Sequence, residues 1–297
     1  MRFILNLNFI LIFICFFIFI DNANGQKNFQ GTVVDSITNK GVPFATVSLV
    51  KANKGTNADE NGEFSIMTTK ISDDTLTVSC IGYETYKIAC LRLSSNPLIK
   101  IRKRVLNLEE VVILGKLQEP KWLNDYSNCG SNWFTSSGTT AMIAKHFHSS
   151  TPKAILTELK FCKMRGKSLF RIRIFDMDTI LFKPSSDLID TIIEVTTIEK
   201  HVKIDLKKYK IIIPQKDFFV AIEWLCIPYN QSNMVIKNAG QRFVITKFLP
   251  ELAVRYINSK LSIEDNFPQT WQYDYRGKWN PSGMNMEMVM AVKLEYQ

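Results

Sequence analysis

The chain has 297 residues, of which 46% are hydrophobic and 22% are charged, and its formal net charge is +9 at pH 7. The length exceeds one typical domain and fits two, so we expect two domains with separate cores. Basic residues are scattered among acidic ones, with no dense basic stripe of the kind that binds nucleic acids, so we predict no nucleic-acid partner.

The basic excess is unevenly shared along the sequence. Residues 26–115 hold eleven Lys or Arg and nine Asp or Glu, which leaves most of the net charge on residues 116–297. We interpret this excess as a solubility feature. The alternative is a surface that attracts an anionic partner such as lipopolysaccharide, an acidic glycan or nucleic acid.

The N-terminus contains an unbroken apolar run, Phe9–Ile20, that ends at Asp21. About a dozen apolar residues are too few for a membrane-spanning helix but suit the core of a signal peptide. Small residues at Ala23–Gly25 indicate cleavage before Gln26. We therefore predict a signal peptide at 1–25 and an exported mature protein without a transmembrane domain. An uncleaved N-terminal anchor is the alternative.

Residues 26–115 alternate apolar and polar side chains over short runs bounded by turn residues, which is typical of half-buried strands. The residues at Lys54–Gly62 favour a hairpin turn, and Gly82 favours a tight bend. This segment is predicted to form a small β-sandwich, with strands at Val42–Val50, Phe64–Ile66, Thr75–Cys80, Tyr83–Leu91, Leu98–Ile101 and Leu108–Leu114.

The remainder of the chain is predicted to comprise a connector at 116–135 and a second domain at 136–297. Good helix formers in Thr139–His148 predict one short helix. The other elements read as strands, which predicts a second antiparallel β-sandwich of the jelly-roll type. The expected strands are Ile155–Cys162, Leu169–Asp176, Ile192–Thr197, His201–Leu206, Lys210–Ile213, Phe218–Ile227, Phe243–Lys247, Ala253–Tyr256, Trp271–Tyr275 and Met286–Tyr296.

Five short motifs carry a family resemblance: Gly31–Asp35, Gly41–Val50, Gly55–Phe64, Ile81–Tyr83 and Leu108–Val112. Together they resemble the carboxypeptidase-like regulatory domain, a transthyretin-like (prealbumin-like) β-sandwich. This domain lies beside the catalytic unit of some metallocarboxypeptidases and ahead of the plug in TonB-dependent outer-membrane transporters of Bacteroidota. The resemblance covers less than a third of the chain. It implies a fold and a Bacteroidota-like cell envelope, but no activity.

The resemblance prompts a search for a peptidase site. The chain has three histidines, His146, His148 and His201, and none is followed by Glu at the His-x-x-Glu spacing that a metallocarboxypeptidase uses for zinc. The roughly 180 residues after the regulatory-like segment are too few for a plug and a large barrel. We therefore predict no metallocarboxypeptidase, no transporter, no metal and no cofactor. The Asp59–Gly62 segment lacks EF-hand spacing and is predicted to be a structural turn.

Five cysteines follow the predicted signal peptide: Cys80, Cys90, Cys129, Cys162 and Cys226. The odd number argues against a complete disulfide framework. Cys80 and Cys90 flank a predicted turn and are placed for a cross-strand bridge, but we favour buried free thiols. Without a CxxC spacing, a thiolate zinc site has no support.

An aromatic patch near the C-terminus is the first candidate ligand site. Trp271, Tyr273 and Tyr275 would share one face of a strand, and Trp279 follows a turn as the member that we expect to be most exposed. An exposed patch would stack on sugar rings, whereas a buried patch would be core. We favour the core reading.

The second candidate is a pair of arginines, Arg171 and Arg173, opposite the apolar face of Phe170, Ile172 and Ile174. We expect both arginines to face water, with an anion site as the alternative. The alternating Met284, Met286, Met288 and Met290 are predicted to line a core face rather than to bind copper(I).

Three functions remain open from the sequence. The first is a non-catalytic, exported cell-envelope protein that acts as a docking or scaffold module, in the periplasm or at the outer membrane or cell surface. The second is a glycan-binding protein that uses Trp271, Tyr273 and Trp279. The third, a hydrolase, requires paired carboxylates in a cleft, and Glu223 with Asp217 is a weak candidate pair. The partner would then be an envelope protein or a glycan.

Overall fold

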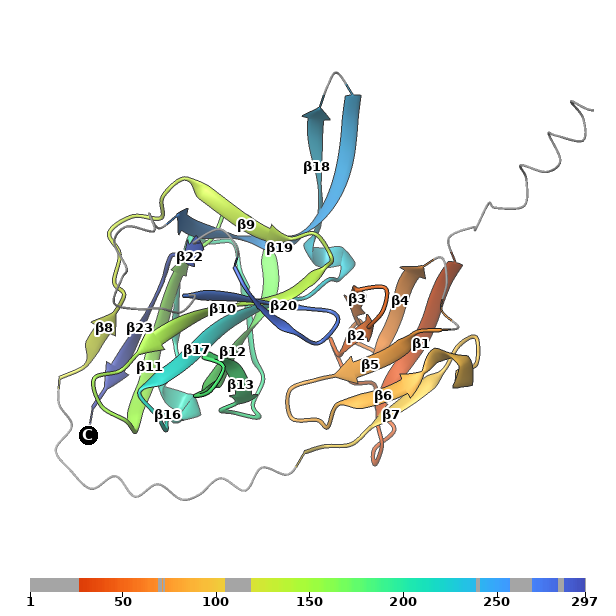
Figure 1. Ribbon diagram of the computed structural model, residues 1–297, viewed down its shortest axis with the longest axis horizontal. Helices are drawn as coiled ribbons and strands as arrows, with labels where there is room; N and C mark the ends of the chain where they lie inside the picture. Colours follow the sequence, from red (N-terminus) through yellow and green to blue (C-terminus); the bar gives the residue numbers. More distant parts are fainter. Residues whose placement is uncertain are drawn as a thin grey trace, which may run out of the picture.

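The computed structural model forms two β domains that lie side by side, coloured red to yellow and yellow-green to blue in Figure 1. Its described residues are 27–68, 71, 73–104, 119–238, 241–256, 269–282 and 286–296. Within these ranges the regular structure consists of strands and three short 3-10 turns, without an α-helix. The predicted all-β fold is therefore confirmed. The predicted signal peptide lies outside the described residues.

The N-terminal domain is a sandwich of two sheets. The first has the order β4 (Glu63–Thr68), β1 (Lys27–Asp35), β7 (Leu98–Ile101), with β1 antiparallel to β4 and parallel to β7. The second, antiparallel sheet has the order β3 (Lys54–Asn57), β2 (Thr46–Leu49), β5 (Thr75–Ser79), β6 (Tyr86–Ala89), and a short turn η1 (Cys90–Arg92) follows β6.

The core of this domain follows from the two-residue period of its strands. In β4 the side chains alternate between exposed and buried, so that Phe64 and Ile66 point inward. They belong to one core cluster with Val33 of the neighbouring strand β1 and with Val47 and Leu76 of the facing sheet. The predicted sandwich is thus confirmed, whereas the expected strand Leu108–Leu114 lies outside the described residues.

The C-terminal domain contains three antiparallel sheets. The largest has the order β13 (Lys183–Asp187), β12 (Ser168–Asp178), β17 (Asp217–Trp224), β10 (Thr140–His148), β20 (Thr270–Asp274), β21 (Trp279–Pro281), with β14 (Ile193–Thr197) also paired to β12. The second has the order β15 (His201–Asp205), β11 (Ala154–Cys162), β23 (Met290–Glu295), β8 (Lys121–Leu123), with β16 (Ile211–Ile213) on β11. Short turns are η2 (Lys207–Tyr209) and η3 (Pro228–Asn230).

The third sheet has the order β18 (Gln231–Asn238), β19 (Gln241–Tyr256), β22 (Met286–Met288), with β9 (Asn132–Ser136) on β19. The strand β18 and the paired first half of β19 form a two-stranded hairpin that projects beyond the rest of the domain (Figure 1). We call this hairpin, Gln231–Phe248, the arm. The sequence pattern predicts part of β19 but misses β18.

The inward faces of the sheets enclose the main core of the domain. It includes Phe170, Ile172 and Ile174 of β12, as their spacing predicts. Met286, Met288 and Met290 are also buried in this core, which confirms the core interpretation for these three residues. Met284 lies outside the described residues.

The predicted helix at Thr139–His148 is wrong, because this segment is the strand β10. β10 lies between β17 and β20, and every residue from Ala141 to Phe147 is buried. Strand pairing on both edges and burial on both faces decide the conformation of this segment. They outweigh helix propensity, because ordinary residues differ in propensity by less than about 1 kcal/mol per residue. The described part of the predicted connector contributes β8 and β9, which pair with β23 and β19.

No helix in the described ranges has the length and apolar character needed to cross a membrane.

Candidate functional site: the interface between the two domains

Arg171 of β12 reaches across from the C-terminal domain to the N-terminal domain. Its Nη2 donates to the Pro43 carbonyl at 3.1 Å and its Nη1 to the Phe44 carbonyl at 3.2 Å. Its Nε lies 3.4 Å from Glu194 Oε2. The guanidinium also lies over the Phe44 ring, 5.4 Å from the centroid. With only 2% of its surface exposed, Arg171 is a buried connection between the domains.

A chain of hydrogen bonds runs beside Arg171 from one domain to the other. Asn57 Oδ1 accepts from the Cys226 backbone N–H at 2.7 Å, while Asn57 Nδ2 donates to Thr46 Oγ1 at 3.1 Å. Thr46 Oγ1 in turn donates to Glu223 Oε1 at 3.1 Å. Thr56 Oγ1 donates to the Cys226 carbonyl at 3.2 Å. Because buried polar groups are costly when unpaired, these bonds fix the relative position of the domains.

Apolar packing closes the interface. Phe44 of the N-terminal domain forms one cluster with Leu225 and Ile227 of the C-terminal domain. Gly55 lies so close to Tyr275 that a Cβ at this position would be 2.1 Å from the ring. A side chain at position 55 would therefore push the domains apart or displace the tyrosine.

A cleft of about 910 Å³ opens between the domains next to this interface. One wall comes from β1, β3 and β4, with Gln30, Glu63 and Ser65 among its side chains. The other comes from the β9–β10 turn, η3 and the base of the arm, and includes Ser137 and Gln231. Most of the lining side chains carry hydroxyl, amide or carboxylate groups.

Local hydrogen bonds order the N-terminal wall of the cleft. Asp59 Oδ1 accepts from the backbone N–H groups of Asn61 at 2.8 Å and Glu63 at 2.9 Å, so its carboxylate holds the turn before β4. This geometry agrees with the predicted structural turn at Asp59–Gly62. Lys54 Nζ donates to the Met67 carbonyl at 3.1 Å. The opposite wall adds one half-buried phenyl ring, Phe248.

The four predicted aromatic residues gather in one apolar cluster, but they do not form an open platform. Trp271 and Tyr275 are buried, with 7% and 2% of their surfaces exposed. Tyr273 and Trp279 pack on this pair, are half-buried, and have ring centroids 5.0 Å apart. Burial raises the pKa of both Tyr273 and Tyr275. Of the four rings, only those of Tyr273 and Trp279 are partly accessible for stacking on a sugar.

The prediction that both arginines face water is wrong. Arg171 is buried by the N-terminal domain, as described above. Arg173 is paired with Asp187, with Nη2–Oδ2 and Nε–Oδ1 distances of 2.6 and 2.9 Å, and only 15% of its side chain is exposed. Burial lowers the pKa of Arg173, but Asp187 and Glu223 outweigh it and raise the value above its usual range. The strand alternation is correct, but the N-terminal domain covers Arg171 and Asp187 of β13 pairs with Arg173.

The candidate carboxylate pair does not form, because Asp217 and Glu223 lie at opposite ends of β17, roughly 20 Å apart at 3.3 Å per residue. Asp217 Oδ1 instead lies 2.9 Å from His146 Nε2 and 2.8 Å from His148 Nδ1. Burial lowers the pKa of His146, and hydrogen bonding to Asp217 opposes this. Glu223 belongs to the interface, and its Oε2 is buried without a hydrogen-bond partner.

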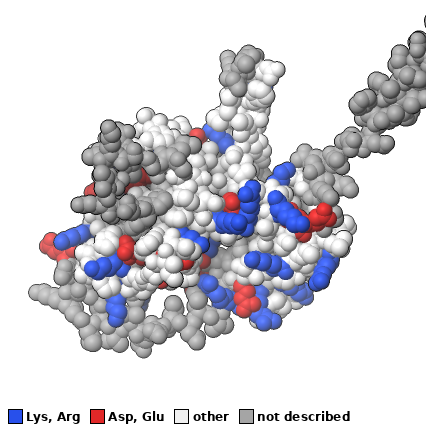
Figure 2. Space-filling model, viewed as in Figure 1, with Lys and Arg blue, Asp and Glu red and all other residues white. Residues whose placement is uncertain are grey.

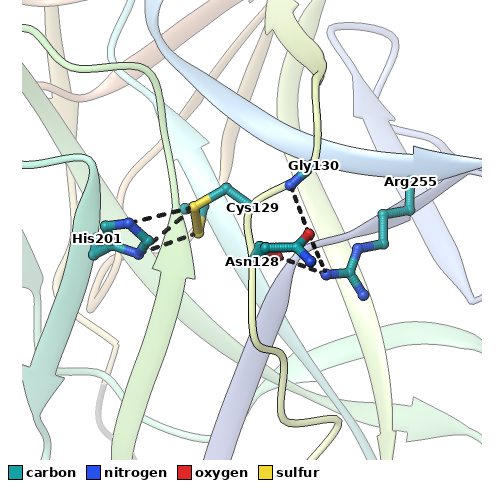
Figure 3. The surroundings of a disulfide bond; sticks show 6 residues. Asn128, Cys129, Gly130, His201 and Arg255 are labelled. Atoms are coloured by element: carbon teal, nitrogen blue, oxygen red, sulfur yellow. Dashed lines mark hydrogen bonds between the residues drawn. A yellow bond between two sulfur atoms is a disulfide. The ribbon is translucent and has the colours of Figure 1, made fainter.

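Cys129 and Cys162 form a disulfide that the sequence pattern does not single out (Figure 3). The His201 ring lies beside it, with Nδ1 3.6 and 3.7 Å from the two sulfur atoms, and the three potential ligand atoms lie within 4.8 Å of one another. The disulfide occupies both sulfurs and joins the segment before β9 to the end of β11. Cys80 and Cys90 are free, in agreement with the interpretation as free thiols, and so is Cys226.

The comparisons with known proteins identify the N-terminal domain. Residues 29–113 match the family model of the CarboxypepD_reg-like domain. This part of the chain is therefore a CarboxypepD_reg-like domain, as its motifs predict. The match covers less than a third of the chain. No curated protein sequence matches the chain significantly.

Similar solved structures include two of the cysteine protease Cwp84, a surface-layer-associated protein of Clostridium difficile. The first, with its protease and lectin-like domains, has 8% identity and a TM-score of 0.33, and covers 54% of this chain and 33% of that chain. The second, after propeptide cleavage, has 8% identity and a TM-score of 0.37, and covers 86% of this chain and 66% of that chain. A candidate carbohydrate-binding protein of Bacteroides uniformis has 10% identity and a TM-score of 0.23, and covers 76% and 96%.

Proposed function

We propose that the protein is a non-catalytic, exported binding protein of the cell envelope, and that its ligand is a glycan held in the cleft between the domains. The observation that carries this proposal is the composition of the cleft. Its walls come from both domains and include twelve side chains with hydroxyl, amide or carboxylate groups, interspersed with apolar ones such as Ile66 and Phe248. Such groups supply the donors and acceptors that sugar hydroxyls require.

The interface supports the proposal because it presents the two walls in a fixed arrangement. Arg171, Asn57 and Thr46 connect the domains through buried hydrogen bonds, so a ligand would not have to order the walls on binding. A preformed site reduces the entropic cost of association. In this scheme the CarboxypepD_reg-like domain is one wall of the site as well as a docking module.

The Cys129–Cys162 disulfide supports export. Disulfides form and persist in oxidising compartments and are rare in the cytosol. The apolar run Phe9–Ile20 provides a signal for export in the same scheme. The periplasm and the cell surface both fit these two features.

A glycan array followed by calorimetry on residues 26–297 tests the proposal. Gln30→Ala and Gln231→Ala remove exposed amides from opposite walls, and each should weaken glycan binding about two- to tenfold, the range of one lost hydrogen bond. Trp279→Ala is the matched variant for the aromatic cluster and should leave the affinity unchanged.

Two results would contradict the proposal. Loss of binding in Trp279→Ala with normal binding in both glutamine variants would move the glycan site to Tyr273 and Trp279. Absence of binding to every arrayed glycan, with turnover of a glycan or peptide substrate, would replace the binding function with an enzymatic one.

A further inference from the structure

The arm exposes large apolar side chains to solvent. The exposed fractions are 67% for Val244, 58% for Val235, 47% for Phe243 and 40% for Met234. Ile236 and Ile245 are each 37% exposed. An accumulation of exposed apolar side chains on one projecting element is unusual for a protein that stays free in water, and it indicates a surface that becomes covered.

Both faces of the arm are apolar. The cross-strand pairs Met234–Ile245 and Ile236–Phe243 lie on one face, and Val235–Val244 lies on the other. Within the described ranges β18 is the outermost strand of its sheet and pairs only with β19. A two-stranded hairpin without a covered face is marginally stable in water, so contact with another surface would stabilise the arm.

The charge of the arm is of one sign. Residues 231–248 contain Lys237, Arg242 and Lys247 and no Asp or Glu. Lys247 at the base is paired with Glu251 at 2.7 Å, and Arg242 is exposed close to the end of the arm. In Figure 2 the described part of the projecting arm is white, without acidic side chains on the visible face.

We propose that the arm docks on an anionic lipid surface. The apolar side chains would enter the interfacial layer of the membrane, and Arg242 would pair with a lipid phosphate. The free backbone edge of β18 excludes insertion into the hydrocarbon core, where unpaired N–H and C=O groups are too costly, but the hydrated headgroup layer satisfies them. The net charge of +9 on the chain adds long-range attraction to the same surface.

The interfacial layer of a membrane can surround both faces of a projecting arm, which the surface of another protein would not do. The apolar side chains of the arm point to both faces, so a partner that covered one face would leave the other exposed. A second copy of the chain would bring the basic ends of two arms, both without acids, towards each other. The proposal is independent of the glycan site, because the distal arm lies outside the cleft.

Vesicle cosedimentation of residues 26–297 tests this proposal. The protein should bind mixed phosphatidylcholine–phosphatidylglycerol vesicles and dissociate as salt is added, with weak binding to phosphatidylcholine alone. Arg242→Gln should weaken binding to the anionic vesicles about fivefold, the effect of one basic residue near a charged surface. Phe243→Ser with Val244→Asp should abolish binding. The side chains of Arg242, Phe243 and Val244 are all exposed, so both variants should retain the fold.

The matched controls remove the same chemistry elsewhere. Ile180→Asp changes an apolar side chain that is 82% exposed outside the arm, and Arg92→Gln removes an exposed charge from the N-terminal domain. Both should bind anionic vesicles almost as the unmodified protein does. Equal binding by the arm variants and the controls would overturn the proposal, as would no binding to anionic vesicles at low salt. A concentration-dependent dimer in sedimentation that the arm variants abolish, without vesicle binding, would assign the arm to a second copy instead.

Discussion

Replacing Arg171 with methionine should uncouple the two domains. Methionine retains most of the aliphatic bulk but removes the hydrogen bonds to the Pro43 and Phe44 carbonyls. After the substitution the Phe44 carbonyl still accepts a hydrogen bond from Asn57 Nδ2 at 3.2 Å. The Pro43 carbonyl loses the guanidinium of Arg171 as its donor. The perturbation therefore acts on the interface and leaves both cores intact.

The structure sets the size of the effect. A hydrogen bond from a charged donor contributes roughly 1.5–3 kcal/mol, and two are lost. The contact to Glu194 adds little, because that side chain is 35% exposed. The free energy of unfolding should fall by about 4 kcal/mol, which corresponds to a decrease in melting temperature of roughly 10 °C for a unit of this size.

Calorimetry is the assay, with Arg165→Met, at an exposed position of the same domain, as the control. The unmodified protein should unfold in one transition, because the buried interface couples the domains. Arg171→Met should give two transitions, the lower one belonging to one separated domain. A single transition shifted by less than about 2 °C would refute the assigned role of Arg171, since it would mean that the interface stays closed without the guanidinium.

Two further predictions concern the disulfide and the pH dependence of stability. Reduction of the disulfide, or the double substitution Cys129→Ala with Cys162→Ala, should lower the free energy of unfolding by about 4 kcal/mol. The reason is that the bond closes a loop with a sequence separation of 33. Equal urea midpoints with and without reductant would contradict this prediction. Burial raises the pKa of Tyr83 and of Tyr126 to about 12, from about 10 in the unfolded chain. Since the fold favours the neutral phenols, their contribution is fully present below pH 10 and is lost as the pH rises through 12. Urea unfolding between pH 9 and about 12 should show this loss, and Tyr83→Phe should reduce its slope; an unchanged slope would show that Tyr83 does not titrate abnormally.

The regular alternation of short strands is sufficient to predict the all-β class. Phe64 and Ile66 in the first domain, and Phe170, Ile172 and Ile174 in the second, point inward as their spacing requires. These predictions succeed because the two-residue period of a strand is a local property that tertiary contacts do not change. The CarboxypepD_reg-like domain is recognisable for a related reason, since its turn and strand motifs are contiguous in the sequence.

The candidate site could not be predicted in the same way. The spacing of Arg171 and Arg173 places them correctly opposite the core, but the N-terminal domain, more than 100 residues away in sequence, covers Arg171, and Asp187 of the neighbouring strand β13 pairs with Arg173. The strand β10 is mistaken for a helix because its pairing partners β17 and β20 are distant in sequence. Propensity does not include those contacts.

The sequence by itself thus determined which side chains point into each sheet, the family of the first domain and the absence of a zinc-peptidase motif. Tertiary structure alone decided that the domains share a buried polar interface, that Cys129 joins Cys162, and that a cleft lies between the domains. It also decided that β18 remains unpaired on its outer edge within the described residues. The physical reason is that each of these features joins residues far apart along the chain, and only the folded packing brings them together.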